Sequence, residues 1–240
     1  MAMFGLFGGK SDGSQAKKLA ERVLNKRTQS PDRWEAIQAL AKLGGAEAVA
    51  ALLPRFTFYV EPSINDQEEK DMAFDGIVRA GAAGIEPILA FLKRTDSITW
   101  PVKMLERIAP EQLIERLLEL LAAMDTEYER DPQKKIQVLV ELEDRRDPPI
   151  APAVARFLDD ANETVRFHAA STLLGQADAS QYCGAMLKRV EQEESVRVRA
   201  RILDGFVQAN WPVENPSAAL RARLPASFSI DPKGKLLKKA

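Results

Sequence analysis

The chain has 240 residues, 45% of them hydrophobic, and a single cysteine. It is therefore long enough to bury a continuous core, and it cannot form an intramolecular disulfide. No secretory signal and no apolar run of about 18 residues is visible, so we expect no membrane span and a cytoplasmic location. The net charge of −1 hides an acidic centre, because residues 61–160 carry 13 lysines and arginines against 22 acids. That acidic centre disfavours nucleic acid as a partner along the middle of the chain.

The chain is expected to begin with a flexible N-terminus over residues 1–14. Phe4, Leu6 and Phe7 stand among glycines there, and they either stay disordered or dock on a partner or a membrane surface. Apolar spacing then predicts an amphipathic helix over residues 15–26, which would cap the elements that follow.

A single helical pattern recurs from residue 32 to residue 224. Its clearest copy spans residues 163–174, where apolar residues at spacings of three and four predict a half-buried helix, with Asn162 as N-cap and Gly175 as stop signal. Each copy is followed by a second apolar segment, so six helix pairs fit this stretch. The corresponding positions in successive copies are Ile37, Phe74, Val102, Ile136, His168 and Arg199.

The repeated residues resemble those of the HEAT-repeat family in its short bacterial form. Val165-Arg166 stands near the start of the first helix and Leu174-Gly175 near its end. The resemblance covers residues 31–224, although the third and fourth units lack the closing glycine. It implies an all-α fold, a right-handed α-solenoid of about six HEAT-like helix pairs over residues 15–225, with the helix near the N-terminus as a cap.

The resemblance also implies how such a protein works. HEAT proteins are scaffolds whose second helices line a concave binding face, and the arginines at the positions of Arg166 and Arg197 pair with acids between repeats. We therefore expect a non-enzymatic adaptor that binds a protein partner of unknown identity. The partner-binding residues expected on this face are Arg55, Phe58, Tyr59, Lys93, Arg94, Arg116, Glu119, Arg156 and Lys188.

Two segments outside the repeat pattern leave alternatives open. Residues 56–60 have strand-like composition, and their aromatic side chains either pack beneath the neighbouring repeat or form a contact site. Residues 226–240 form a basic C-terminal tail, with four lysines against one acid. This tail either folds back over the last repeat or hangs free.

Groups suited to catalysis are scarce. His168 is the single histidine and Cys183 the single cysteine, so a zinc site of several histidines or cysteines is excluded. We predict no catalytic residue, no metal and no cofactor. A Cys183–His168 nucleophile pair in an enzyme of unknown substrate is the competing interpretation, but both residues lie in apolar helical patterns that are typical of packing.

Two enzyme families built from similar repeats provide further alternatives by fold analogy. The alkylpurine DNA glycosylases use a basic groove, and a nucleic-acid-binding or DNA-repair function would here use the basic tails with Arg197, Arg199 and Arg201. The phycobilin lyases share the short repeat type, but no bilin pocket is recognisable in the sequence.

Overall fold

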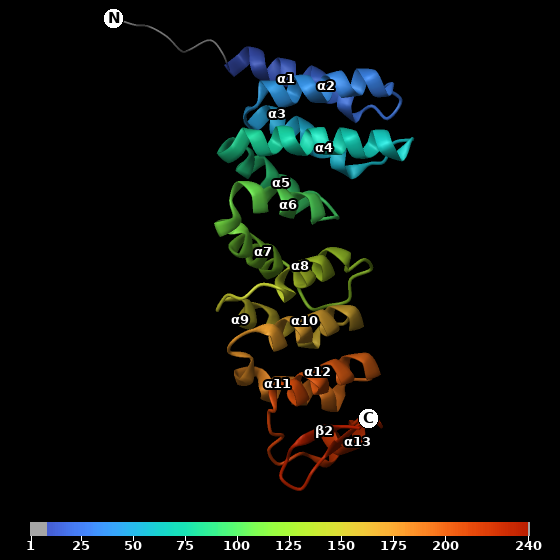
Figure 1. Cartoon of the computed structure of the whole chain (residues 1–240), viewed down its shortest axis with the longest axis vertical. Helices are drawn as coiled ribbons and strands as arrows, with labels where there is room; N and C mark the ends of the chain where they lie inside the picture. Colours follow the sequence, from blue (N-terminus) through green and yellow to red (C-terminus); the bar gives the residue numbers. More distant parts are fainter. Residues whose placement is uncertain (1–8, 240) are drawn as a thin grey trace, which may run out of the picture. The chain divides into compact units, whose positions relative to one another are not determined.

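The computed structural model describes residues 9–239 and is mostly helical (Figure 1). This confirms the prediction of an all-α class. The chain forms two compact units, Met1–Leu113 and Ile114–Ala240. The boundary falls inside the third predicted helix pair, and the single solenoid over residues 15–225 stays a prediction.

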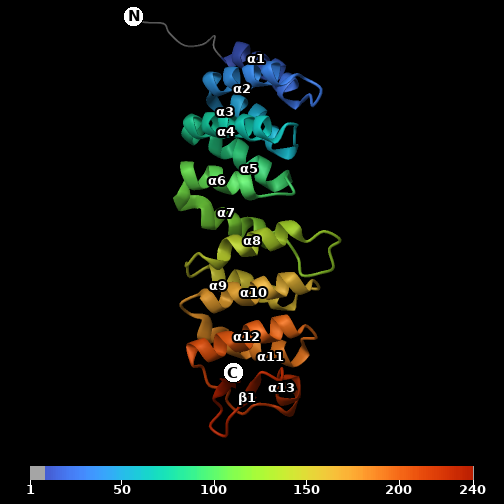
Figure 2. The ribbon, with the colours of Figure 1, turned by 45° about the vertical axis from the view of Figure 1, so that its right-hand side comes forward.

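Unit 1 is built from two rows of helices (Figures 1 and 2). In one row α2 (Ser30–Leu43) packs on α4 (Ser63–Ala80), which packs on α6 (Thr99–Ile108). In the other row α3 (Gly45–Leu52) packs on α5 (Ile85–Arg94). Short 3-10 turns Leu53–Thr57, Gly81–Gly84 and Pro110–Gln112 join or extend these helices. Helices that alternate along the chain thus lie in separate rows, and α2 packs directly on α3.

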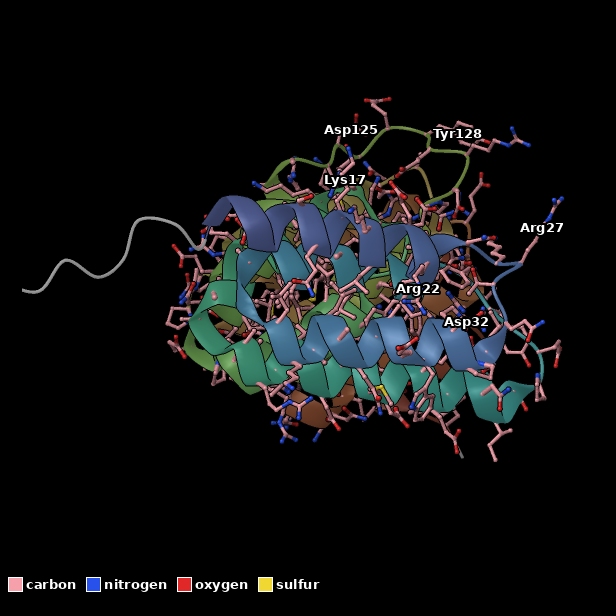
Figure 3. The ribbon with its side chains drawn as sticks, turned by 90° about the horizontal axis from the view of Figure 1, so that it is seen from above. Lys17, Arg22, Arg27, Asp32, Asp125 and Tyr128 are labelled. Carbon is pink, nitrogen blue, oxygen red and sulfur yellow. The ribbon has the colours of Figure 1, made fainter. Side chains whose placement is uncertain are left out.

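The first helix covers one side of unit 1. α1 (Gly9–Leu24) packs on α2 and α3 and buries Ala16 and Val23. Arg22 at its end bonds the carbonyl oxygen of Asp32 at 3.1 Å, and Figure 3 shows the two residues close together. The helix starts at Gly9, earlier than the expected start at residue 15. Phe4, Leu6 and Phe7 lie outside the described residues.

Glycine allows α2 and α4 to pack closely. A Cβ atom on Gly76 would lie 2.5 Å from the Cβ of Ala41 and 3.0 Å from its Cα. A real Cβ atom does not occupy such a position, so any larger residue would push the two helices apart. Gly76 thus sets the spacing of the row.

Unit 2 has the same kind of arrangement. α10 (Glu163–Gly175) packs between α8 (Gln133–Glu143) and α12 (Val196–Ala209). α7 (Leu113–Ala122) precedes α8. The second helices that follow α8 and α10 are α9 (Ile150–Val154), with its 3-10 extension Ala155–Asp159, and α11 (Cys183–Gln192), which follows the 3-10 turn Ala179–Tyr182.

The helix expected over residues 163–174 is confirmed as α10. Its N-cap Asn162 accepts hydrogen bonds from the backbone amides of Thr164 and Val165, at 2.9 and 3.2 Å. Ser195 caps α12 in the same way through the amide of Val198. Side-chain caps satisfy amides that the helix itself leaves without partners, which explains why both helices begin where they do.

The C-terminal residues fold back on unit 2. After α13 (Ala218–Arg223), β1 (Phe228–Ile230) and β2 (Leu236–Lys238) pair antiparallel, with Ile230 opposite Leu236. β2 packs on α12, and Phe228 and Leu236 are buried. Of the two alternatives for this segment, the structure therefore supports folding back over the last helix pair.

Candidate functional site

A buried cluster of charged side chains joins α2, α4 and the 3-10 turn Leu53–Thr57 of unit 1. Glu69 of α4 accepts hydrogen bonds from Nε of Arg33 at 2.7 Å and from Nε of Arg55 at 2.8 Å. Arg55 also bonds Asp66 at 2.7 Å and the carbonyl oxygen of Phe58 at 3.1 Å. Arg55 is 0% exposed, so its expected place on a partner-binding face is wrong. Its guanidinium group is paired with Asp66 and Glu69, two acids of the next helix pair.

Asp66 is held ionised by this cluster. Burial raises the pKa of its carboxyl group, but hydrogen bonds from Lys70, Arg55 and the amide of Val60 outweigh burial and lower the pKa below its usual value. The same contacts fix the connector that precedes α4. The cluster therefore holds two helix pairs and the segment between them in place.

The strand-like segment 56–60 forms no strand. Phe56 packs on Trp100, with ring centroids 4.7 Å apart. Phe58 is buried, and the Cζ atom of Arg55 lies over its ring, 4.6 Å from the ring centroid. Phe58 is thus a packing residue, and its expected role as an apolar anchor on an exposed face is wrong. Tyr59 is 53% exposed and remains available for contacts.

Unit 2 contains ion pairs in corresponding places. Lys135 of α8 bonds Asp160 at 2.9 Å. Arg166 of α10 makes a two-pronged contact with Glu193, at 2.6 and 2.8 Å. In each pair a basic residue at the start of a first helix bonds an acid that precedes the next one, so these contacts tie neighbouring helix pairs together.

Arg166 and Arg197 have the structural contacts that the family resemblance implies. Arg197 of α12 bonds Glu163 of α10 at 3.0 Å. Arg166 and Glu193 change each other's pKa: the hydrogen bond that Arg166 donates to the Glu193 carboxylate raises the pKa of the Arg166 guanidinium. Burial raises the pKa of Glu193, but bonds from Arg166 and the Ser195 amide outweigh it and lower that pKa. Both ion pairs join one helix pair to the next.

The remaining predicted site residues lie on second helices, as expected, but some have internal roles. Arg116 on α7 pairs with Glu119 at 2.8 Å. Arg156 donates to the carbonyl oxygens of Leu121 and Met124, at 2.9 and 2.6 Å, and so holds the end of α7. Together with Tyr59, the exposed members of the predicted set are Lys93, Arg94, Glu119, Arg156 and Lys188.

A groove lies between α3 and α5 of unit 1, with a volume of about 390 Å³. Alanines and prolines line its walls, among them Ala50 and Ala90, and Phe91 lies at its floor. Glu86 and Arg94 line it from the first and last turns of α5, about 12 Å apart along the helix axis. Because the alanine side chains are small, they leave open space between the two helices. The groove therefore has apolar walls, with the negative charge of Glu86 near one end and the positive charge of Arg94 near the other.

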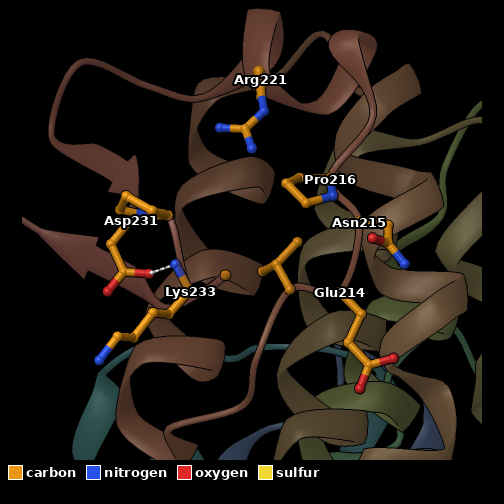
Figure 4. A pocket seen from close by; sticks show the side chains of 9 residues that line it. Glu214, Asn215, Pro216, Arg221, Asp231 and Lys233 are labelled. Atoms are coloured by element: carbon orange, nitrogen blue, oxygen red, sulfur yellow. Dashed lines mark hydrogen bonds between the residues drawn. The ribbon is translucent and has the colours of Figure 1, made fainter.

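Two further hollows lie in unit 2. One, of about 650 Å³, lies between residues 213–216, 231–234 and α13, and Figure 4 shows the Arg221 side chain pointing into it. The other, of about 400 Å³, is lined by Cys183, Leu187 and Trp211. Burial raises the pKa of the Cys183 thiol, so the thiol stays protonated at neutral pH and is a poor nucleophile.

Cys183 and His168 do not form a pair. Nδ1 of His168 lies 2.5 Å from Oε1 of Glu143 on α8, whereas no hydrogen bond joins it to Cys183. The arrangement lacks the contact between nucleophile and base that a catalytic pair requires. It therefore gives no support to the competing interpretation as an enzyme.

The loop between α7 and α8 is another exposed feature. Tyr128 is 83% exposed, and Figure 3 shows Tyr128 and Asp125 pointing outward. The amide of Ala161 bonds the carbonyl oxygen of Thr126 at 2.9 Å, which anchors the base of the loop. Its acids lie close in sequence, but no group of three or more metal-binding side chains comes together within residues 9–239.

Sequence reasoning did not single out the groove alanines or Arg221. An alanine in an apolar helix looks the same in sequence whether it faces a core or an open groove, so Ala50 and Ala90 give no distinct signal. Arg221 lies within the last apolar segment, where nothing in the sequence marks it as facing a hollow. None of the described helices is long and apolar enough to cross a bilayer.

Comparisons of the chain with protein-family models, with curated proteins and with solved structures find no match to any of them.

Proposed function

We propose that the protein is a cytoplasmic, non-enzymatic scaffold with a HEAT-like solenoid arrangement, and that the groove between α3 and α5 binds a segment of a protein partner. The observation that supports this proposal is the groove itself, an apolar hollow between α3 and α5, the second helices of the first two predicted pairs. Arg94, one of the predicted contact residues, lines it, and Lys93 next to it is exposed.

The contacts between helix pairs support the HEAT-like part of the proposal. In both units a basic side chain at the start of a first helix reaches an acid of the following pair, as Arg33 does with Glu69 and Arg166 with Glu193. Such repeated contacts between neighbours are typical of proteins that stack similar units. A single cysteine in the chain agrees with a reducing compartment.

The test uses a variant that fills the groove without disturbing the core. Ala50 is exposed on α3 and lines the groove, so Ala50→Arg places a long charged side chain in the proposed site. Gln38→Arg is the matched control, because Gln38 is exposed on α2, in the other row of helices. Both variants should unfold at the temperature of the wild type.

Partners are captured from lysate with the wild type and both variants, and the bound material is washed at low and at high salt. We expect at least one protein that survives high salt, is lost with Ala50→Arg and is kept with Gln38→Arg. If every captured protein binds all three forms equally, the groove is not the partner site. Nucleic acid released at high salt would instead favour the alternative of a nucleic-acid-binding protein.

A further inference from the structure

The C-terminal cap, residues 211–239, has a surface charge unlike that of the rest of unit 2. It contains six lysines and arginines against two acids, Glu214 and Asp231. Elsewhere in unit 2, Lys135, Arg166 and Arg197 are each bound to an acid of a neighbouring helix pair. The cap therefore holds positive charge that the fold does not use for its own stability.

Most of these cations have no partner among the described residues. The side chains of Arg221 and Lys233 make no hydrogen bond and no ion pair there, and the same holds for Arg223, Lys235 and Lys239. Lys238 alone is paired, with Asp204 at 2.7 Å. The carboxylate of Asp231 is occupied, since it accepts hydrogen bonds from the backbone amides of Lys233 and Lys235 at 2.8 Å each.

The walls of the hollow in the cap are held by backbone contacts. The amide of Val213 donates to the carbonyl oxygen of Gly234 at 2.8 Å, and Pro212 lies opposite Lys235. Gly234 has a φ of 80°, and a Cβ atom there would lie 2.7 Å from the Val213 oxygen, so glycine is needed at this contact. In Figure 4 Arg221 points into the hollow, and Glu214 extends away from Arg221.

We propose that the C-terminal cap binds an acidic peptide segment of a partner protein, with Arg221 and Lys233 contacting its carboxylates. This surface is separate from the groove between α3 and α5 and goes beyond the function proposed for that groove. A guanidinium group presents a planar pair of N–H donors that matches a carboxylate. Lys233 also lines the hollow, and its side chain, which extends away from Arg221 in Figure 4, supplies a second positive charge on the surface of the cap.

Two observations favour a peptide over nucleic acid. The described residues that line the hollow include no aromatic ring, whereas single strands bind by stacking their bases on aromatic side chains. Glu214 and Asp231 also lie at the hollow, and they would repel a continuous row of phosphates. The carboxylates of a peptide stand on flexible side chains that can turn toward the cations and away from the two acids, whereas phosphates are part of the backbone of a nucleic acid.

The test measures binding of octaglutamate labelled with fluorescein to the full-length protein, by fluorescence anisotropy. The cap variant is Arg221→Gln with Lys233→Gln. The matched control is Lys17→Gln with Arg27→Gln, which removes the same charge from exposed, unpaired positions of unit 1, labelled in Figure 3. We expect binding about tenfold weaker for the cap variant and within about twofold of wild type for the control.

Two further variants show whether binding depends on the charge of the cap and whether it is independent of the groove. The charge-preserving variant Arg221→Lys with Lys233→Arg should bind octaglutamate more tightly than the cap variant, since both charges and one guanidinium group remain. The groove variant Ala50→Arg should bind octaglutamate as the wild type does, so failure of the groove as a partner site would leave this result unchanged.

The proposal is overturned if the cap variant, with an unfolding temperature equal to that of the wild type, binds octaglutamate equally well. It is also overturned if an oligothymidylate with eight phosphates binds more tightly than octaglutamate and loses affinity in the cap variant. That result would identify the cap as a phosphate-binding surface.

Discussion

Replacing Glu69 by glutamine is expected to destabilise the protein strongly. The Glu69 carboxylate is fully buried and accepts bonds from Arg33, Arg55 and Ser30, at 2.7, 2.8 and 3.2 Å. Glutamine keeps the size of the side chain but removes its negative charge, and its amide nitrogen cannot accept a bond. Of the two buried guanidinium groups, Arg55 would then keep Asp66 as its acid, and Arg33 would have no acid among the described residues.

The size of the effect follows from the burial of the groups left behind. Arg33 is 3% exposed and Arg55 is 0% exposed, so water cannot reach the two guanidinium groups and solvate them when the carboxylate is lost. Removing one partner of a buried ion pair typically costs about 3–5 kcal/mol, because the other charge stays buried without compensation. We expect a loss of that order in the free energy of unfolding.

Equilibrium unfolding in urea, followed by circular dichroism, measures this loss. Glu68→Gln is the control, since Glu68 is the exposed neighbour on the same helix, and it should change the free energy of unfolding by less than about 0.5 kcal/mol. If Glu69→Gln lowers the free energy of unfolding by less than about 1 kcal/mol, the buried cluster does not stabilise the contact between the helix pairs.

Two further predictions concern helix spacing and pH. Gly76→Ala should lower the free energy of unfolding by about 1–3 kcal/mol, because the new Cβ would overlap Ala41. The control Gly184→Ala has open space around it and should raise the free energy of unfolding by about 0.4–1 kcal/mol. Equal effects of the two variants in urea unfolding would contradict the close packing of α2 and α4. The pKa of Glu193 is lowered in the folded protein, so its contribution to stability is present above the ordinary pKa of a glutamate, about 4.3, and is lost as the pH falls through the folded value. The difference in stability between the wild type and Glu193→Gln should therefore shrink in acid, and a difference independent of pH would show that Glu193 is not held ionised by Arg166.

The sequence by itself determined the helices and their recurrence. The spacing of apolar residues by three and four is a local property, and so are caps such as Asn162, which is why the helix expected over residues 163–174 matches α10, Glu163–Gly175. The resemblance to HEAT repeats also implied that Arg166 and Arg197 pair with acids of neighbouring units, and both do.

Only the tertiary structure decided which side chains are exposed. Arg55 follows an apolar segment and looks like a surface residue, yet the packing of α4 brings Asp66 and Glu69 to it and buries all three. In the same way, the sequence shows a turn over residues 231–234 and an alternation of Phe228 and Ile230 with polar residues, but only the pairing of β1 with β2 and the packing on α12 show that the last lysines belong to a hairpin. Helical periodicity depends on neighbours three and four positions away, whereas burial, ion pairing and open grooves depend on which distant segments meet when the helices pack.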